Sequence, residues 1–346
     1  VLGCAVSETA TAMEVSTRTL AVAGLTLTSG YDSYLIAYRT SLANGETGVG
    51  TMLLYVPDTP RNEQDSPIVV ANHGGVDLPD ACAPSKAVQL LSFTNSIALP
   101  WAGSGYPVAL PDFAGKGTVG IPGVGNTQDL GYSALDAARA ARNALPADAA
   151  NDDVLAVGSA EGGHAAYAMQ ALAGTYAPEL NFVAAIGFAT SYPTISYADL
   201  LRAGGLFPLV DGIGITRALT ALIAYSNAYH LYGENRAREI FAPALRDYVG
   251  NAVETQCSLE LVITLATDTA DYAPPAVIAG LIEPTFRTDV VDCLNAVNCT
   301  ADAQAFVDRA AANVAPLDAS GGDLLFISAL DGSRPNVQDQ TCLLEW

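Results

Sequence analysis

The sequence has 346 residues, with 36 acidic and 15 basic side chains and a formal net charge of −21. Half of the residues are hydrophobic and only 15% are charged, which is too apolar for a disordered chain and too poor in bases for a nucleic-acid binder. An anionic membrane surface would repel such a chain. The sequence contains no run of eighteen apolar residues, so it predicts no stable membrane span. We therefore expect a globular protein with a sizeable core, in one large domain or two.

The first half of the chain alternates strand-like and helix-like segments. Short apolar or alternating runs between turn residues predict strands, and apolar residues at three- and four-residue steps predict helices. The predicted strands are 34–38, 50–56, 68–72, 106–110, 153–157 and 182–188, and the predicted helices are 85–92, 129–145 and 162–172. Asn44-Gly45 is a hairpin turn signal between the first two strands. Such alternation indicates an α/β fold with a mostly parallel central sheet flanked by helices.

The pattern changes between about residue 192 and residue 320, where helix-like segments such as 215–229 and 301–314 dominate. One more strand is predicted at 324–328. A helical block between two strands of one sheet indicates an inserted cap. We expect residues 1–191 to form the first part of the core, 192–320 to form a helical cap or lid, and 321–346 to form the return strand with its following loop.

Six cysteines occur, without the C-x-x-C pair that would favour a structural zinc site. Their even number and long spacings favour disulfides and an oxidising compartment, with buried free thiols as the alternative. Cys293 and Cys299 close a short loop and are the pair that spacing favours. Val1-Leu2-Gly3-Cys4 resembles a bacterial lipobox, so a lipid anchor at Cys4 is a further alternative. We expect a secreted protein, either extracellular or periplasmic.

The segment Gly158-Ser159-Ala160-Glu161-Gly162 lies between a predicted strand and a predicted helix. This is the setting of a nucleophile elbow, G-x-S-x-G, in which small residues let strand and helix approach around a strained nucleophile. Alanine occupies the nucleophile position and Ser159 is one residue out of frame, so the chain as it stands cannot form an acyl-enzyme. Either a serine was replaced deliberately to trap a substrate, or an enzyme relative has lost its activity. A glycine-rich turn without a catalytic history is the structural alternative.

Two further motifs belong to the same predicted end of the sheet. His73-Gly74-Gly75-Val76 follows an earlier strand, where its backbone N–H groups and that of Glu161 would form an oxyanion hole. Asp331 follows the last predicted strand, which is the place of the acid in an Asp–His pair, although aspartate before glycine is also a common turn. No histidine follows Asp331. We therefore expect the natural protein to continue beyond Trp346 and to carry the catalytic histidine there.

The chain resembles the secretory lipase family of the lipase A type, within the α/β-hydrolases. The residues that carry this resemblance are Asp80-Ala81-Cys82-Ala83-Pro84-Ser85, the elbow Gly158 to Gly163, and Tyr176-Ala177-Pro178-Glu179-Leu180-Asn181. The resemblance implies a lipase or esterase with Ala160 at the serine position, Asp331 as the acid and Asp77 in the oxyanion loop. It also implies that Cys82 pairs with Cys257, which leaves Cys342 to pair with Cys4 or with a cysteine beyond Trp346.

The predicted activity is hydrolysis of a carboxylic ester, such as an acylglycerol, a fatty-acyl ester or an aromatic ester, by a serine acyl-enzyme mechanism. It needs neither a metal nor an organic cofactor, and contact with a lipid interface would be transient. Apolar cap residues are expected to line the acyl pocket, with core packing as the alternative for at least half of them: Leu206, Phe207, Leu209, Ile213, Ile215, Leu219, Leu222 and Ile223. A catalytically inactive binding protein and a peptidase or amidase of the same fold are the alternative functions.

Overall fold

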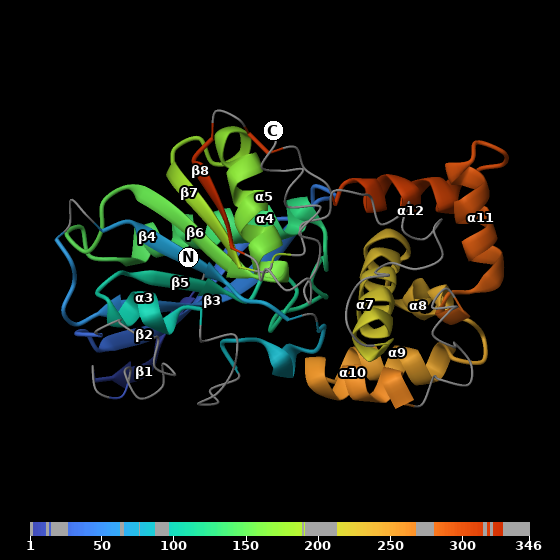
Figure 1. Ribbon diagram of the computed structural model, residues 1–346, viewed down its shortest axis with the longest axis horizontal. Coiled ribbons are helices and arrows are strands. Elements are labelled where there is room, and N and C mark those ends of the chain that lie inside the picture. The colour runs from blue at the N-terminus through green and yellow to red at the C-terminus, as the bar shows by residue number, and fades with distance from the viewer. Residues whose placement is uncertain are drawn as a thin grey trace.

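The computed structural model describes residues 3–11, 14, 27–62, 66–75, 77–86, 97–188, 190, 213–267, 280–313, 317–318 and 321–327, with the side chains of 3–10, 213–216 and 258 left out. Within these ranges one sheet of eight strands has the order β1-β2-β3-β5-β4-β6-β7-β8 (Figure 1). The strands are β1 (Gly3–Ala10), β2 (Tyr31–Ser41), β3 (Thr47–Pro57), β4 (Ile68–Asn72), β5 (Val108–Pro111), β6 (Asp153–Ser159), β7 (Asn181–Phe188) and β8 (Asp323–Ile327). The pairings from β1 to β5 are antiparallel, and those from β5 through β4, β6 and β7 to β8 are parallel.

The antiparallel half of the sheet contains the predicted hairpin. Gly45 has a φ of 84°, and the Leu42 N–H donates to the Glu46 carbonyl over 2.8 Å, which closes the turn between β2 and β3. Strand β1 was not among the predicted strands, because its sequence GCAVSETA lacks a clear apolar alternation. It pairs with the outer edge of β2 instead, a long-range contact that no local pattern announces.

Two long helices cover one face of the parallel half. They are α4 (Thr127–Ala144) and α5 (Glu161–Tyr176), which correspond to the predicted helices 129–145 and 162–172, and the short α3 (Leu99–Gly103) precedes β5. The Asn126 side chain caps α4 by accepting from the Asp129 N–H over 3.0 Å. Small alanine side chains let the helices approach the sheet closely, and the buried ones include Ala134, Ala138, Ala141, Ala165, Ala166 and Ala173. Of the predicted helix 85–92, residues 87–92 lie outside the described ranges.

Between β7 and β8 the described elements are helices, with one isolated β-bridge between Phe241 and Ile282. They are α7 (Ile213–Tyr232), α8 (Glu234–Ala237), η3 (Arg238–Ile240), α9 (Arg246–Thr255), α10 (Ser258–Thr267), α11 (Pro284–Leu294) and α12 (Ala301–Ala311). We call this block the helical insert; it lies beside the sheet in Figure 1 and has its own hydrophobic core. The predicted boundaries at 191/192 and 320/321 fall outside the described residues and stay a prediction.

The helical insert meets the rest of the molecule through hydrophobic packing, in which Leu78 and Val124 take part, and through polar contacts and a disulfide. Arg309 on α12 donates from Nη2 to Asp129 Oδ2 on α4 over 2.7 Å, and both side chains are buried. The other carboxylate oxygen of Asp129 accepts from the Ala43 N–H at the β2–β3 turn. A disulfide joins Cys82, in the short helix η2 (Asp80–Cys82), to Cys257, and a second one joins Cys293 to Cys299 inside the insert. The structure thus contains both cysteine pairs expected from the sequence.

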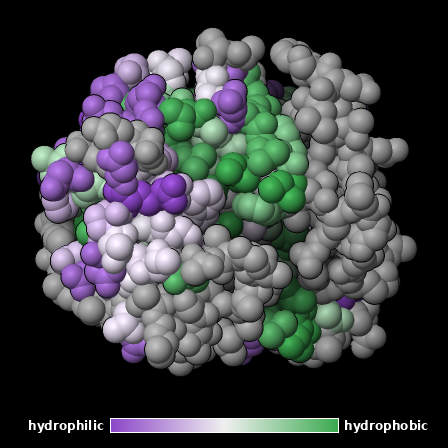
Figure 2. All heavy atoms as spheres, turned by 60° about the vertical axis from the view of Figure 1, so that its left-hand side comes forward, coloured by the Kyte–Doolittle hydropathy of each residue, from purple (hydrophilic) through white to green (hydrophobic). Residues whose placement is uncertain are grey.

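The surface is not uniformly polar despite the net charge. On the face shown in Figure 2, hydrophobic side chains gather in one area and hydrophilic ones in another. Strand β8 contributes exposed apolar side chains, since Leu325 is 51% exposed. None of the described helices is long and apolar enough to cross a bilayer.

Candidate active site

The turn between β6 and α5 holds its central residue in a backbone conformation that residues other than glycine rarely adopt. Ala160 has φ of 50° and ψ of −116°, lies between the last residue of β6 and the first residue of α5, and is exposed. The Ala160 N–H donates to the Phe188 carbonyl over 3.0 Å, and the Ala160 carbonyl accepts from Gly163 N–H over 3.1 Å. Surrounding structure therefore fixes a strained backbone and presents the side chain of residue 160 to solvent, as a nucleophile elbow requires.

The glycines at both ends of this turn, residues 158 to 162, allow backbone to meet backbone. A Cβ atom on Gly158 would lie 1.9 Å from the carbonyl oxygen of Gly162. A Cβ atom on Gly162 would lie 2.0 Å from the carbonyl oxygen of Asn72, at the end of β4. No side chain can replace hydrogen at either position without moving the strand or the helix. We call residues 158–162 the elbow from here on.

The predicted oxyanion residues come together at the carboxyl ends of β4 and β6. These strands are neighbours, with Asn72 paired to Gly158, so the segment that follows β4 lies beside the elbow. A Cβ atom on Gly74 would lie 2.8 Å from the Ser159 hydroxyl oxygen, which places the Ser159 side chain against this segment and not at the elbow position. Gly75 has a φ of 112°. We call residues 73–77 the oxyanion loop; Val76 lies outside the described residues.

A buried ion pair lies next to the oxyanion loop. The Lys116 ammonium contacts the Asp77 carboxylate, and their side chains are only 3% and 9% exposed. Glu161, the first residue of α5, is also buried and accepts from the Gly125 N–H over 3.2 Å. Burial raises the pKa of Glu161 to about 7, against the opposing effect of the Lys116 charge. Lys116 was not among the predicted site residues, although its position as one of two lysines, between two glycines after a predicted strand, was a usable signal.

Residues 88–196, which include the elbow, match the family model described as secretory lipase. This segment is thus similar to the secretory lipase family, and the chain as a whole has an α/β-hydrolase fold. The rice cell wall degrading esterase LipA from Xanthomonas oryzae superimposes with a TM-score of 0.74 at 18% identity, covering 99% of this chain and 86% of that chain. Candida antarctica lipase A in its closed state gives a TM-score of 0.66 at 18% identity, covering 97% of this chain and 70% of that chain. No curated protein sequence matches.

The three histidines of the sequence are held by contacts of their own. His73 is buried with its ring 5.0 Å from that of Phe113, and burial together with the Lys116 charge lowers its pKa to about 3. His164 on α5 is 2.9 Å from the Thr127 hydroxyl, and burial lowers its pKa to about 3 as well. His230 lies on α7 with its Nε2 3.2 Å from the Ile121 carbonyl. These environments keep the imidazoles neutral and packed, and the predicted acid Asp331 lies outside the described residues.

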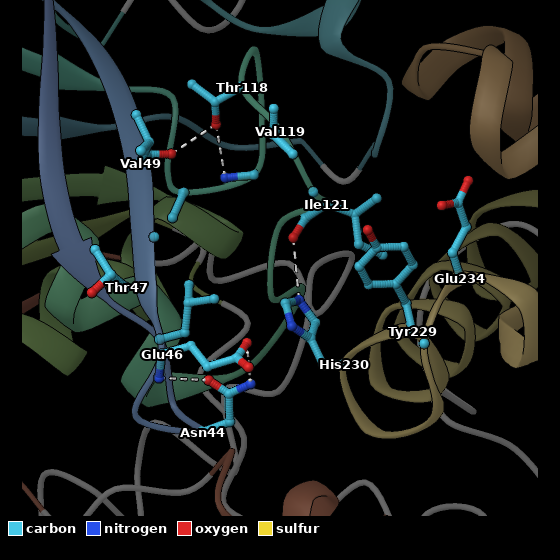
Figure 3. Close-up of a pocket in the computed structure, with 16 residues that line it drawn as sticks. Asn44, Glu46, Thr47, Val49, Thr118, Val119, Ile121, Tyr229, His230 and Glu234 are labelled. Atoms are coloured by element: carbon cyan, nitrogen blue, oxygen red, sulfur yellow. Dashed lines mark hydrogen bonds between the residues drawn. The ribbon is translucent and has the colours of Figure 1, made fainter.

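A cavity of about 740 Å³ lies between the β2–β3 turn, the loop 114–121 and the end of α7 (Figure 3). Glu46 and Glu234 lie on opposite walls of the cavity. Tyr229 and His230 extend from α7 of the insert toward the loop. No elbow residue is among its lining residues, so the largest cavity that we describe is separate from the elbow.

The predicted acyl-pocket residues do not line this cavity within the described structure. Leu206, Phe207 and Leu209 lie outside the described residues, as do the side chains of Ile213 and Ile215 on α7. Leu222 and Ile223 are buried in the hydrophobic core of the helical insert. Leu222 and Ile223 thus pack in the core, which was the alternative to a place in the acyl pocket.

Proposed function

We propose that this chain has the scaffold of a carboxylic ester hydrolase and that its elbow lacks the nucleophile. The observation that carries the proposal is the backbone of Ala160, which is strained, exposed and fixed between β6 and α5. Such strain persists at functional sites and has no use at an ordinary turn, where glycine would relieve it. In this reading residue 160 is the serine position of an acyl-enzyme mechanism.

The chemistry follows from what converges on that position. A serine at 160 would attack the ester carbonyl, and the backbone N–H groups of Glu161 and the oxyanion loop would stabilise the oxyanion. The N-terminus of the sixteen-residue helix α5 adds a favourable dipole at the same place. Asp331 is the proposed acid, which orients the histidine that takes the serine proton. With alanine at 160 the site binds an ester without cleaving it.

The secretory description of the matched family and the two disulfides support a protein that works outside the reducing cytosol. We propose acylglycerols, fatty-acyl esters or aromatic esters as substrates. The name of the Xanthomonas oryzae structure supports an esterase, and that of the Candida antarctica structure supports a lipase.

The test is Ala160→Ser in the full-length protein, assayed with short- and long-chain nitrophenyl esters and with peptide substrates. We expect ester turnover at least about 10³-fold above that of the Ala160 protein, because a triad nucleophile contributes at least that factor. Ser159→Ala in the Ala160→Ser background is the matched control, and it should leave turnover within a few-fold. Ester turnover that Ala160→Ser does not raise would refute the proposal, and turnover of peptides alone would favour the peptidase alternative.

A further inference from the structure

We propose that Lys116 is a positioning residue for the oxyanion side of the site, where its ammonium offsets the carboxylate charge of Asp77. This inference rests on the proposed function and extends it to a residue that no motif of the sequence assigns. It starts from the unusual placement of the two lysines. Lys86 is 47% exposed and 3.9 Å from Asp80, whereas Lys116 is buried against Asp77.

The loop after β5 is shaped to turn Lys116 inward. Phe113, Gly115 and Gly117 all have positive φ, at 68°, 81° and 74°. A Cβ atom on Gly115 would lie 2.3 Å from the Ile121 carbonyl oxygen, so the loop folds back tightly on itself. The Gly117 N–H donates to Asp80 over 2.9 Å, which anchors the loop to η2 beyond the oxyanion loop. A chain reversal of this kind is costly, and its result is a buried ammonium beside the site.

Four titratable groups interact with Lys116 from three segments: His73 and Asp77 after β4, Asp112 after β5, and Glu161 at the start of α5. Asp112 has its own partners, because it accepts from the Thr51 hydroxyl over 2.6 Å and from the Ser85 N–H over 2.8 Å. Glu161 accepts from the Gly125 N–H. The direct contact pairs Lys116 with Asp77, and the Lys116 charge also lowers the pKa of Glu161 and of His73.

An oxyanion that develops between the Glu161 N–H and the oxyanion loop would form close to the Asp77 carboxylate. The Asp77 side chain is only 9% exposed, and like charges repel more strongly through a protein interior than they do in bulk water. Without Lys116, Asp77 would thus oppose the charge that the backbone N–H groups stabilise. With Lys116 in place the pair is neutral and the oxyanion loop is fixed in one arrangement.

A buried ion pair is by itself a poor source of stability, because desolvation offsets much of the attraction between the charges. A role restricted to stability therefore predicts changed unfolding and unchanged catalysis in Lys116 variants. The positioning role predicts a loss in kcat with little change in KM, because the oxyanion exists only in the transition state.

The first measurement needs no activity. In the Ala160 protein, ¹³C NMR of labelled glutamate, assigned with Glu161→Gln, follows the titration of Glu161. We expect Lys116→Met to raise the pKa of Glu161 and Asp77→Asn to lower it, since the Lys116 charge lowers this pKa and the Asp77 charge raises it. Lys86→Met is the matched control and should leave the titration unchanged. A Glu161 titration that does not respond to Lys116→Met would overturn the proposal.

The second measurement uses the Ala160→Ser background and nitrophenyl esters. Lys116→Met should lower kcat at least about tenfold, Lys116→Arg less than Lys116→Met, and Lys86→Met not at all. Adding Asp77→Asn to Lys116→Met should restore most of the loss, because the charge that needed offsetting is gone. If Lys116→Met does not fold, the variant that combines Lys116→Met with Asp77→Asn provides the test. A combined variant that folds but does not turn over the ester would overturn the proposal.

The two proposals fail in different ways. An inactive Ala160→Ser protein would remove the proposed function, and with it the role of Lys116 in catalysis. Full kcat in Ala160→Ser with Lys116→Met, accompanied only by a lower unfolding temperature, would remove the inference about Lys116 and leave the ester hydrolase proposal intact.

Discussion

At the elbow, strand and helix touch at the level of the backbone, whereas the helical insert meets the core through side chains and one disulfide. Gly158 and Gly162 leave no space for a Cβ atom, and the strained residue between them is fixed from both sides. The insert instead packs side chains around a hydrophobic cluster that also takes in Leu78 and Val124, and it makes polar contacts such as Arg309 with Asp129. The backbone contacts of the elbow tolerate almost no change in sequence, whereas contacts between side chains can be replaced by others of similar volume.

This difference indicates where function can vary. Acyl-transfer chemistry needs atoms placed to within fractions of an ångström, and backbone packing supplies that precision. In the proposed function, recognition of different esters would need side chains that can vary, and the side-chain contacts of the insert allow that variation. Substitutions at the elbow and at the insert test this difference.

The largest effect is expected at the elbow, for Gly162→Ala. The added methyl would overlap the Asn72 carbonyl, so α5 or β4 must move, and we expect a loss of more than about 4 kcal/mol in the free energy of unfolding. Gly174→Ala on the same helix is the control, because its Cβ would meet only Asp318 at 3.4 Å and alanine favours helix. Urea denaturation followed by circular dichroism measures both. Equal stability of the two variants would contradict the backbone-contact account.

A smaller effect is expected at the attachment of the insert, for Arg309→Met. This change leaves Asp129 buried without its cation, and we expect a loss of about 3 kcal/mol, with faster hydrogen exchange in α12. Arg236→Met is the control, since Arg236 contacts Asp302 over the same 2.7 Å but at half-exposed positions, and it should barely change the unfolding midpoint. If both substitutions have the same effect, burial of the Arg309 pair does not hold the insert in place.

The smallest effect is a pH dependence at the elbow, for Glu161→Gln. Burial raises the pKa of Glu161 from 4.5 to about 7, so the folded state disfavours the carboxylate and the protein loses stability as pH rises through this range. Glutamine should remove that loss, on the order of 2 kcal/mol at pH 8. Unfolding measured from pH 4 to pH 8 tests this.

The low-pH part of the curve of stability against pH provides an internal control for the same measurement. The pKa values of His73 and His164 are lowered to about 3, so their contribution to stability is present above about 6.5 and is lost as pH falls. Below about pH 4.5, where the Glu161 carboxyl is protonated in both the folded and the unfolded state, Glu161→Gln should leave the slope of stability against pH unchanged. If stability changes with pH between pH 5 and pH 7 as steeply in the variant as in the parent, Glu161 is not the group that causes the loss of stability.

Much of the fold was predictable because its elements carry local patterns. The predicted strand 68–72 is β4 without change, and the predicted helix 129–145 is α4 within two residues at its start and one at its end. The elbow was predictable for the same reason, since Gly158 and Gly162 lie only four positions apart in the sequence. Strand β1 was not, because it forms by pairing with β2, and neither was the position of β5 between β3 and β4.

By itself, the sequence determined the α/β class, the helical block before the last strand, and alanine at the position where an elbow carries serine, because periodicity and short motifs are local properties. Only the tertiary structure decided that Ala160 is strained and exposed, that Ser159 lies against Gly74, and that Lys116 is buried with Asp77. These facts depend on which segments meet at the carboxyl ends of β4, β5 and β6. That meeting is fixed by packing between residues far apart in the chain, which no local pattern records.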